Sequence, residues 1–372
     1  MSGWAEALRA RRWSIGLGLL IGGLGLLFAL AGAPLDEVID GVRAADPGWV
    51  ALTGLTFLVQ QALRAWRQVL LLQGRYPRFG LRSSLSVLCI SFFFINSLPA
   101  RLGELARPLL LLEREGVPFG AGFALMVVER AVDLCAMCLM LGALVWIAPV
   151  PEAGFQVGGA SVPLQQLARG AVGLTLPLVV GGLTIALLWG APIWRAISDR
   201  LPAEAPGLRG RLLRAARSMG GDFTAATTAL ASPSRIAGVL ALTAATWGTT
   251  ALMYPMLARA FGIEGFIGLR EGWGLLGVAM ASLALPAAPG FAGTYEAFLI
   301  GGLRLFGVAG PAAAPGSALS LDAVALAYAL TMHWWVHLVQ SASALWFLIR
   351  DRIDPIRLLA ALGEALGKPP AP

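Results

Sequence analysis

The stretch Asn96-Ser97-Leu98-Pro99-Ala100-Arg101-Leu102-Gly103-Glu104-Leu105-Ala106-Arg107 places a proline, a glycine, two arginines and a carboxylate inside an otherwise apolar segment. A second stretch of the same character lies near the far end of the chain, Leu285-Pro286-Ala287-Ala288-Pro289-Gly290-Phe291-Ala292-Gly293-Thr294-Tyr295-Glu296. Each pattern predicts a membrane helix that breaks, turns and restarts with a glutamate in its first new turn. Bilayers tolerate non-helical backbone only where protein or a water-filled cavity surrounds it. The two breaks therefore indicate an internal polar site.

The composition is that of a polytopic membrane protein. Of its 372 residues, 57% are hydrophobic and only 13% are charged, and the mean hydropathy is +0.74. A soluble domain has about 25% charged residues. The net charge of +7 comes from arginines in loops that we expect to be cytoplasmic, so it does not predict nucleic-acid binding. We expect no nucleic-acid partner and no cofactor.

The apolar runs and arginine-rich loops predict an all-α integral membrane protein. Two segments, residues 84–112 and 273–308, have arms shorter than the roughly 20 residues that a span needs, and we expect each to be a re-entrant helical hairpin. The first apolar run ends in a possible signal-peptide cleavage site, but the topology requires it as a retained helix. The predicted spans are residues 13–31, 48–72, 119–148, 167–189, 236–261 and 321–349.

The order of these elements predicts a single transmembrane domain, residues 1–372, built of two inverted repeats. Each repeat, residues 13–148 and residues 167–349, has three membrane-spanning helices plus one re-entrant helical hairpin. Three crossings are an odd number, so the second repeat starts on the opposite side and its hairpin tip is expected to meet the first near the midplane. Residues 190–234 form a cytoplasmic basic connector, either an interfacial helix or a solvated segment.

The arginines near the first break are candidates for binding an anionic substrate. Restarted helices direct backbone N–H groups and a partial positive charge at the break, and guanidinium groups suit phosphate. Arg64 and Arg67 share a helix face, where they either snorkel to lipid phosphates or form a rim for an anionic substrate. The predicted substrate-binding residues are Arg101, Arg107, Arg130, Asn96 and Tyr295.

Carboxylates and histidines inside the predicted spans are candidates for proton coupling or counter-charge, because intramembrane ionisable groups are rare and usually functional. The alternatives are structural: Glu104 and Glu296 as helix caps, Arg130 with Glu104 as an ion pair closing the bundle, and the histidines as hydrogen-bonding groups. A metal at the histidines would need a third ligand, and none is expected. The predicted coupling or counter-charge residues are Glu104, Glu129, Asp133, Glu296, His333 and His337.

At these residues the sequence resembles the lysylphosphatidylglycerol synthase transmembrane-region family, or flippase-like domain family. Three stretches carry the resemblance, Asn96–Arg107, Glu129–Asp133 and, more loosely, Leu285–Glu296. The resemblance covers most of residues 10–350. It implies a membrane domain that moves lipids with charged headgroups, such as aminoacylated phosphatidylglycerol, between leaflets. From the arginine distribution we expect a multi-pass protein of the bacterial cytoplasmic (inner) membrane with both termini cytoplasmic. Some members are associated instead with polyprenyl-linked sugar assembly.

These observations predict a lipid flippase or transporter whose substrate is an anionic or zwitterionic phospholipid or a polyprenyl-phosphate lipid. The first alternative is a membrane glycosyl- or phospho-transferase that acts on a polyprenyl-phosphate lipid. A second alternative is a membrane scaffold for lipid-synthesis enzymes. The deep position of the charges favours transport over both. A lipid-modifying enzyme is a candidate partner, and the absence of a Walker loop predicts passive or ion-coupled transport.

Overall fold

The computed structural model describes residues 12–30, 33–98, 103–147, 154–157, 160–200, 213, 217, 220–222, 224, 232–283, 285 and 288–367. Pro99, Arg101, Pro286 and most of the basic connector therefore lie outside the described residues. The elements in chain order are α2 (Arg12–Leu30), α3 (Leu35–Ala44), α4 (Pro47–Leu72), α5 (Leu81–Ser97), α6 (Ala106–Glu115), α7 (Phe119–Ile147), β1 (Gly154–Val157), β2 (Ala160–Pro163), α8 (Leu164–Ser198), α10 (Pro233–Ala260), α11 (Leu269–Ser282), the 3-10 turn η2 (Pro289–Phe291), α12 (Thr294–Leu305), α13 (Leu321–Arg350) and α14 (Pro355–Gly367).

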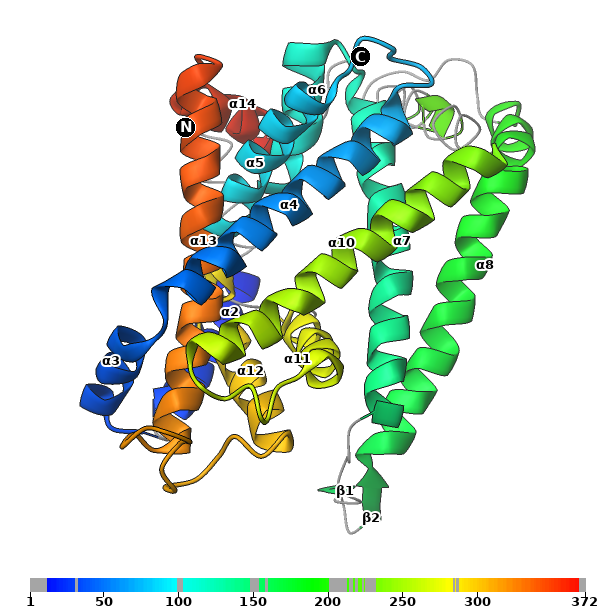
Figure 1. Cartoon of the computed structure of the whole chain (residues 1–372). Helices are drawn as coiled ribbons and strands as arrows, with labels where there is room; N and C mark the ends of the chain where they lie inside the picture. The colour runs from blue at the N-terminus through cyan, green and yellow to red at the C-terminus, as the bar shows by residue number, and fades with distance from the viewer. Residues whose placement is uncertain are drawn as a thin grey trace.

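The expected all-helical architecture is present (Figure 1). Each of the six predicted spans is a helix, from 19 residues in α2 to 35 in α8. By length and apolar composition, α10 is the described helix that could cross a membrane by itself, and a bent pair, residues 15–30 with α3, could form a second span. The sequence did not predict the short helices α3 and α14, nor the antiparallel β1–β2 hairpin.

The first predicted break separates α5 from α6. Helix α5 ends where Leu98 adopts an extended conformation, with ψ of 138°, as the residue before a proline prefers. The chain then folds back closely on itself: a Cβ at Gly103 would lie 2.2 Å from the carbonyl carbon and oxygen of Phe94. Only a residue without a side chain allows that approach. Helix α6 ends at Gly116, whose φ of 64° is the left-handed conformation common after a helix.

The second predicted break separates α11 from α12 and contains the turn η2. Gly290 and Gly293 have φ values of 67° and 82°, and Phe291 has a φ of 60°. A bulky side chain at positive φ is an unfavourable backbone conformation that surrounding structure must hold in place. Helix α2 contributes to this support, because Gly22 and Gly25 bring its backbone against Ala292 and Gly293.

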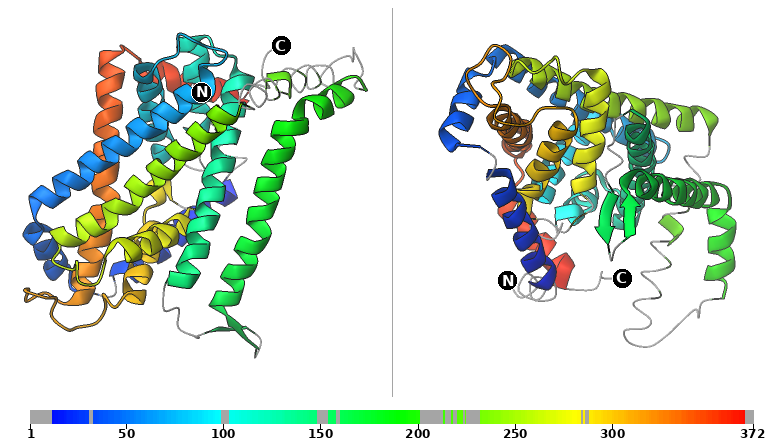
Figure 2. Two further views of the ribbon diagram at one scale, coloured as in Figure 1. Left: turned by 45° about the vertical axis from the view of Figure 1, so that its right-hand side comes forward. Right: turned by 90° about the horizontal axis from the view of Figure 1, so that it is seen from below.

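The two broken pairs lie at opposite ends of the molecule: α5 and α6 in its upper half in Figure 1, α11 and α12 in its lower half. They meet where α5 packs against η2, and a Cβ at Gly290 would lie 3.7 Å from the carbonyl oxygen of Asn96. Around this contact, α4 packs along α10, α5 packs against α13, and α11 packs against α7. Figure 2 shows α8 against α7 at the outside of the bundle.

The end of α13 is fastened to the first broken pair by Asp351. Its Oδ2 accepts hydrogen bonds from the hydroxyl of Ser86 at 2.6 Å and from Arg114 at 3.1 Å, and Arg82 lies 3.8 Å from its Oδ1. Burial alone raises the pKa of the Asp351 carboxyl, but these hydrogen bonds and the charges of Arg114 and Arg82 outweigh it. The pKa therefore lies below its ordinary value of 3.8.

Replacing Gly103 with alanine should destabilise the first broken pair. The added methyl group meets the Phe94 backbone, which cannot rotate away, so we expect a loss of about 1–3 kcal/mol, measured by thermal unfolding in detergent. Gly80→Ala is the matched control, because a Cβ there meets nothing within 4 Å. Equal melting temperatures for the two variants would show that the close approach is absent.

Replacing Asp351 with asparagine should lower the free energy of unfolding at pH 7 by about 1–2 kcal/mol. The pKa of this carboxyl is depressed in the folded state, so its contribution is present above about pH 4 and is lost as the pH falls through the folded pKa. The difference between Asp351→Asn and the unmodified protein should therefore shrink below about pH 4. The exposed Glu113→Gln serves as the control, and a difference that stays constant with pH would contradict this account.

Candidate functional site: an arginine pocket and a histidine–glutamate pair

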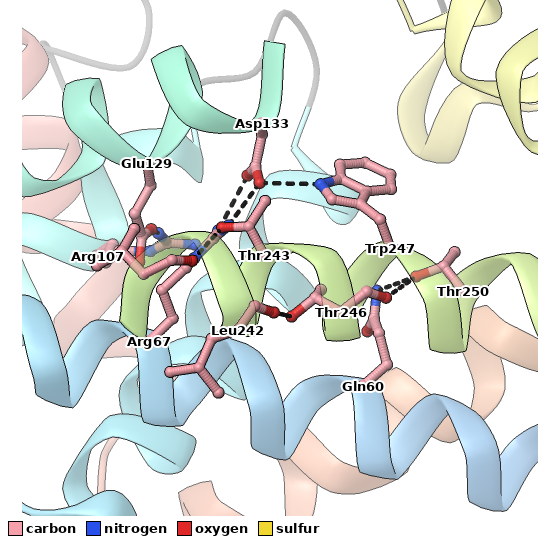
Figure 3. Close-up of polar contacts among 11 residues, drawn as sticks. Gln60, Arg67, Arg107, Glu129, Asp133, Leu242, Thr243, Thr246, Trp247 and Thr250 are labelled. Carbon is pink, nitrogen blue, oxygen red and sulfur yellow. Dashed lines mark hydrogen bonds and ion pairs between the residues drawn. The ribbon is translucent and has the colours of Figure 1, made fainter. Parts of the chain in front are cut away.

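Polar faces of α4 and α10 meet along their contact. Gln60, Arg64 and Arg67 recur at i, i+4 and i+7 and so share one face of α4. Thr243 and Thr250 recur at the same spacing on α10. The side-chain oxygen of Gln60 lies 3.1 Å from the Thr250 hydroxyl and accepts from Arg64 at 3.2 Å, and Arg67 donates to the Thr243 hydroxyl at 3.0 Å. Two largely apolar helices are thus joined by a row of side-chain hydrogen bonds (Figure 3).

Arg67 forms a two-point ion pair with Asp133 of α7. Its two terminal nitrogens donate to the two carboxylate oxygens at 2.7 and 3.1 Å, and the indole N–H of Trp247 donates to the same carboxylate at 3.2 Å. The Arg67 side chain is only 3% exposed. Parallel guanidinium–carboxylate bonds fix geometry as well as charge, so this contact sets α4, α7 and α10 relative to one another.

A second buried ion pair joins the restarted helix α6 to α7. Arg107 donates to Glu129 at 2.5 Å, and their side chains are 3% and 6% exposed. Arg107 also lies over the ring of Phe92, 5.1 Å from its centroid. Glu129 is ten residues into α7, about 15 Å along its axis, so this pair lies deep within the helix.

These pairs line a small pocket between α4, α5, α6 and α7. We call it the arginine pocket and define it by the six charged residues among those that line it, Arg64, Arg67, Arg107, Glu129, Arg130 and Asp133.

The arginine pocket has an excess of positive charge. Four guanidinium groups face two carboxylates, which leaves two formal positive charges. Within the described ranges, Arg64 and Arg130 form no ion pair; Arg64 lies over the rings of Phe92 and Trp247, and Arg130 is exposed. The buried Nε atoms of Arg67 and Arg107 have no hydrogen-bond acceptor among the described residues. Because buried N–H groups are normally paired, these two groups are candidate donors to an anion.

A separate polar cluster surrounds His333 of α13. Its Nδ1 lies 2.7 Å from Glu296 Oε1, and its Nε2 lies 2.8 Å from the carbonyl oxygen of Gly290. A carbonyl oxygen only accepts, so Nε2 carries a hydrogen. The contact with Glu296 then holds one proton, either on Nδ1 facing a carboxylate or on a carboxylic acid facing neutral Nδ1. The pair is a proton-sharing unit buried at the second break.

Neighbouring groups extend this cluster. The other oxygen of Glu296 accepts the backbone N–H of Gly293 at 2.8 Å, so Glu296 caps the restarted helix α12 in addition to facing His333. The ring of Tyr295 stacks on His333 with centroids 4.5 Å apart. The His337 Nδ1 donates to the His333 carbonyl at 2.9 Å, which leaves its buried Nε2 as an acceptor with no described donor.

The structure groups the residues predicted from sequence into two clusters rather than one. Arg107, Glu129, Arg130 and Asp133 gather at the arginine pocket, whereas Tyr295, Glu296, His333 and His337 gather at the second break. Asn96 contributes its backbone to the meeting of the breaks. Glu104 lies half-buried in the 3-10 turn of residues 103–105. Arg101 lies outside the described residues.

Sequence reasoning misjudged the charges on α4. Snorkelling of Arg67 to lipid phosphates is wrong, because that side chain is buried against Asp133. Among the described residues, the buried ion pair between α6 and α7 is that of Arg107 with Glu129, and no ion pair joins Arg130 to Glu104 there. The polar face of α4, with residues at i, i+4 and i+7, could have indicated that Arg67 is buried. Because α4 ends near an arginine-rich loop, Arg67 was instead grouped with the charges at the membrane surface.

Comparisons with known proteins support a membrane, lipid-related assignment. A family model described as lysylphosphatidylglycerol synthase TM region matches residues 15–331. A curated relative, "Glycosyltransferase AglD" of Haloferax volcanii, is 26% identical over 308 residues, which cover 77% of this chain and 48% of the relative. This chain therefore spans about half the length of that relative. No solved structure matches the chain.

Removing one partner of the pair between Arg67 and Asp133 should strongly destabilise the fold. Arg67→Leu leaves a buried carboxylate without its guanidinium, which costs about 3–5 kcal/mol, whereas removing both charges is often close to neutral. Thermal unfolding of Arg67→Leu, Asp133→Leu and the double variant should show recovery in the double variant. Arg43→Leu is the control, because Arg43 is 77% exposed in its pair with Asp40. Additive losses in the double variant would contradict direct pairing.

Proposed function

Because this chain belongs to the lysylphosphatidylglycerol synthase transmembrane-region family, we propose that it is a lipid flippase or transporter. Its substrate is a lipid with a charged headgroup, a phospholipid or a polyprenyl-phosphate lipid, which it moves between the two leaflets. The protein is a membrane protein, since the family it belongs to is described as a TM region. The arginine pocket is the observation that carries the proposal.

The arginine pocket lies far along α7 from its first residue, where charged side chains inside a membrane are rare and usually functional. Arg130 is about 16 Å along α7 from its first residue, and its side chain is exposed. An arginine at that depth in a membrane faces water or a charged ligand rather than hydrocarbon. A headgroup can enter beside Arg130 while its apolar chains stay in the bilayer. Arg64, Arg67 and Arg107 would then meet the headgroup from the inner side of the pocket.

The packing of the helices supports the two inverted repeats that alternating access would use. In the proposed correspondence α4 matches α10, α5 matches α11, α6 matches α12 and α7 matches α13. Helix α5 packs against α13 as α11 packs against α7. The ion pair of Arg107 on α6 with Glu129 on α7 has its counterpart in Glu296 on α12 with His333 on α13. The acidic and basic partners exchange helices between repeats.

The same correspondence suggests how transport could be coupled. His333 and Glu296 share one proton, and the buried Nε2 of His337 is a nearby acceptor that lacks a donor. We propose these groups as the coupling residues, with Tyr295 stacked on the site. Glu129 and Asp133 act as counter-charges that hold Arg107 and Arg67 in place. Asn96, Arg101 and Glu104 remain candidates from sequence alone.

The alternative function is a membrane glycosyl- or phospho-transferase that acts on a polyprenyl-phosphate lipid. The printed name of the curated relative, a glycosyltransferase, is the observation that favours it, although this chain spans about half of that protein. A transferase needs a carboxylate free to act as a base. Of the two candidate bases, Glu104 and Asp133, Asp133 is instead held by Arg67. Glu129 and Glu296 are likewise held by Arg107 and His333, which favours transport.

We propose the bacterial cytoplasmic membrane as the location, with both termini cytoplasmic and a lipid-modifying enzyme as a candidate partner. Positive charge in loops favours the cytoplasmic side. The end that carries α14 has five arginines near the described helix ends, whereas α3 at the opposite end is acidic in its first turn. Those arginines are Arg82, Arg114, Arg350, Arg352 and Arg357.

Leaflet exchange in liposomes tests the proposed function. Purified protein reconstituted with fluorescent phospholipid should make lipid in the inner leaflet accessible to an external quencher, and Arg130→Gln should slow the exchange by about tenfold, the effect of losing one charge-assisted hydrogen bond. Arg130 has no ion-pair partner among the described residues, so folding should be retained.

Arg43→Gln on the exposed face of α3 is the matched control and should exchange lipid at the unmodified rate. Headgroup turnover without exchange would favour the transferase. The absence of both lipid exchange and headgroup turnover would favour the scaffold function. Exchange by Arg130→Gln at the unmodified rate would remove the arginine pocket from the mechanism.

A further inference from the structure

The charge balance of the arginine pocket points to a particular class of headgroup. We infer that the pocket selects a terminal phosphate, a lipid phosphate monoester or diphosphate ester with two negative charges, over the phosphodiester of common phospholipids and over cationic aminoacylated headgroups. This inference rests on the proposed function for the claim that the phosphate belongs to a lipid.

The net charge of the arginine pocket favours an anion with two negative charges. The two carboxylates neutralise two of the four guanidinium groups, and Arg64 and Arg130 have no carboxylate partner among the described residues. A phosphate monoester carries −1.5 to −2 charges near pH 7 and presents three terminal oxygens, as phosphorylated side chains do. It therefore balances the pocket. A phosphodiester carries one charge and two such oxygens, so it leaves one of these two positive charges without a counter-charge.

Hydrogen-bond donors that lack an acceptor also favour an anion rich in oxygen. The buried Nε atoms of Arg67 and Arg107, side chains that are each 3% exposed, lack acceptors in the described structure. Both residues line the arginine pocket. An oxygen-rich anion would satisfy these N–H groups, whereas an ammonium group would add donors where donors are already in excess.

A cationic aminoacylated headgroup would need a carboxylate partner, and both carboxylates of the arginine pocket are already paired. Asp133 accepts two hydrogen bonds from Arg67 and one from Trp247, and Glu129 is held by Arg107. A cationic headgroup would have to displace a buried guanidinium to reach either one. Four surrounding arginines would also repel it.

Binding of short-chain lipids to the purified full chain in detergent tests this inference by calorimetry. At pH 7.5 we expect dioctanoyl phosphatidic acid to bind about tenfold or more tightly than dioctanoyl phosphatidylglycerol, the gain from one further charge-assisted contact. A lysyl ester of phosphatidylglycerol should bind more weakly still. Arg64→Gln should bring phosphatidic acid down to the affinity of phosphatidylglycerol, whereas Arg43→Gln should leave the preference unchanged.

A pH series separates charge from shape. The second pKa of a phosphate monoester is about 6, so lowering the pH from 7.5 to 5.5 should weaken phosphatidic acid binding severalfold and leave phosphatidylglycerol unaffected. The charged groups that face the ligand from α4, α6 and α7 are the six of the arginine pocket, and none is a histidine. Thr243 and Trp247 of α10 add no charge.

The remaining outcomes separate this inference from the proposed function. Equal or tighter binding of phosphatidylglycerol or its lysyl ester would overturn the inference, even if the protein exchanges those lipids in liposomes. A phosphatidic acid preference without leaflet exchange would support a phosphate site and remove the transporter. Inorganic phosphate that binds as tightly as phosphatidic acid would show that a lipid is not the selected source and would overturn that part of the claim.

Discussion

The structure depends on burying arginine inside a bundle of mostly apolar helices. Burying the Arg67 guanidinium there without a partner would cost much free energy. Its partners are Asp133 on α7 and Thr243 on α10. Because a two-point guanidinium–carboxylate contact tolerates little rotation, it fixes these helices against one another. Arg107 and Glu129 do the same for the restarted helix α6. The helices that support the pocket are therefore held by the charges that line it.

The same constraint explains why the pocket is available to a ligand. Each carboxylate is used by one arginine, and no described carboxylate is paired with Arg64 or Arg130. A bundle that needed charge only for its own packing would balance its acids and bases. The surplus instead leaves a site that an anion can neutralise. At the second break the basic partner of Glu296 is a histidine, His333, rather than an arginine. The pair can therefore hold one proton without a permanent positive charge.

Much of the architecture could be predicted because its causes are local. Apolar runs, the proline that follows Leu98 and the glycines near Gly290 act on the chain within a few residues, and the six long helices and two breaks are present where expected. The partners of Arg67 and Arg107 could not be predicted, because they depend on which helix faces are in contact. The inverted repeat remains a prediction, supported by reciprocal packing of the two sets of helices.

The sequence by itself determined that this is a helical membrane protein with two interrupted helices and a set of deep charges, because hydropathy and backbone restrictions are properties of short segments. Tertiary structure alone decided that those charges form two clusters and that Arg67 is buried rather than exposed to lipid headgroups. It also decided that Arg64 and Arg130 have no carboxylate partner in the described part of the chain. The physical reason is that the energy of a buried charge depends on the atoms within a few ångströms of it, and packing between distant segments supplies those atoms.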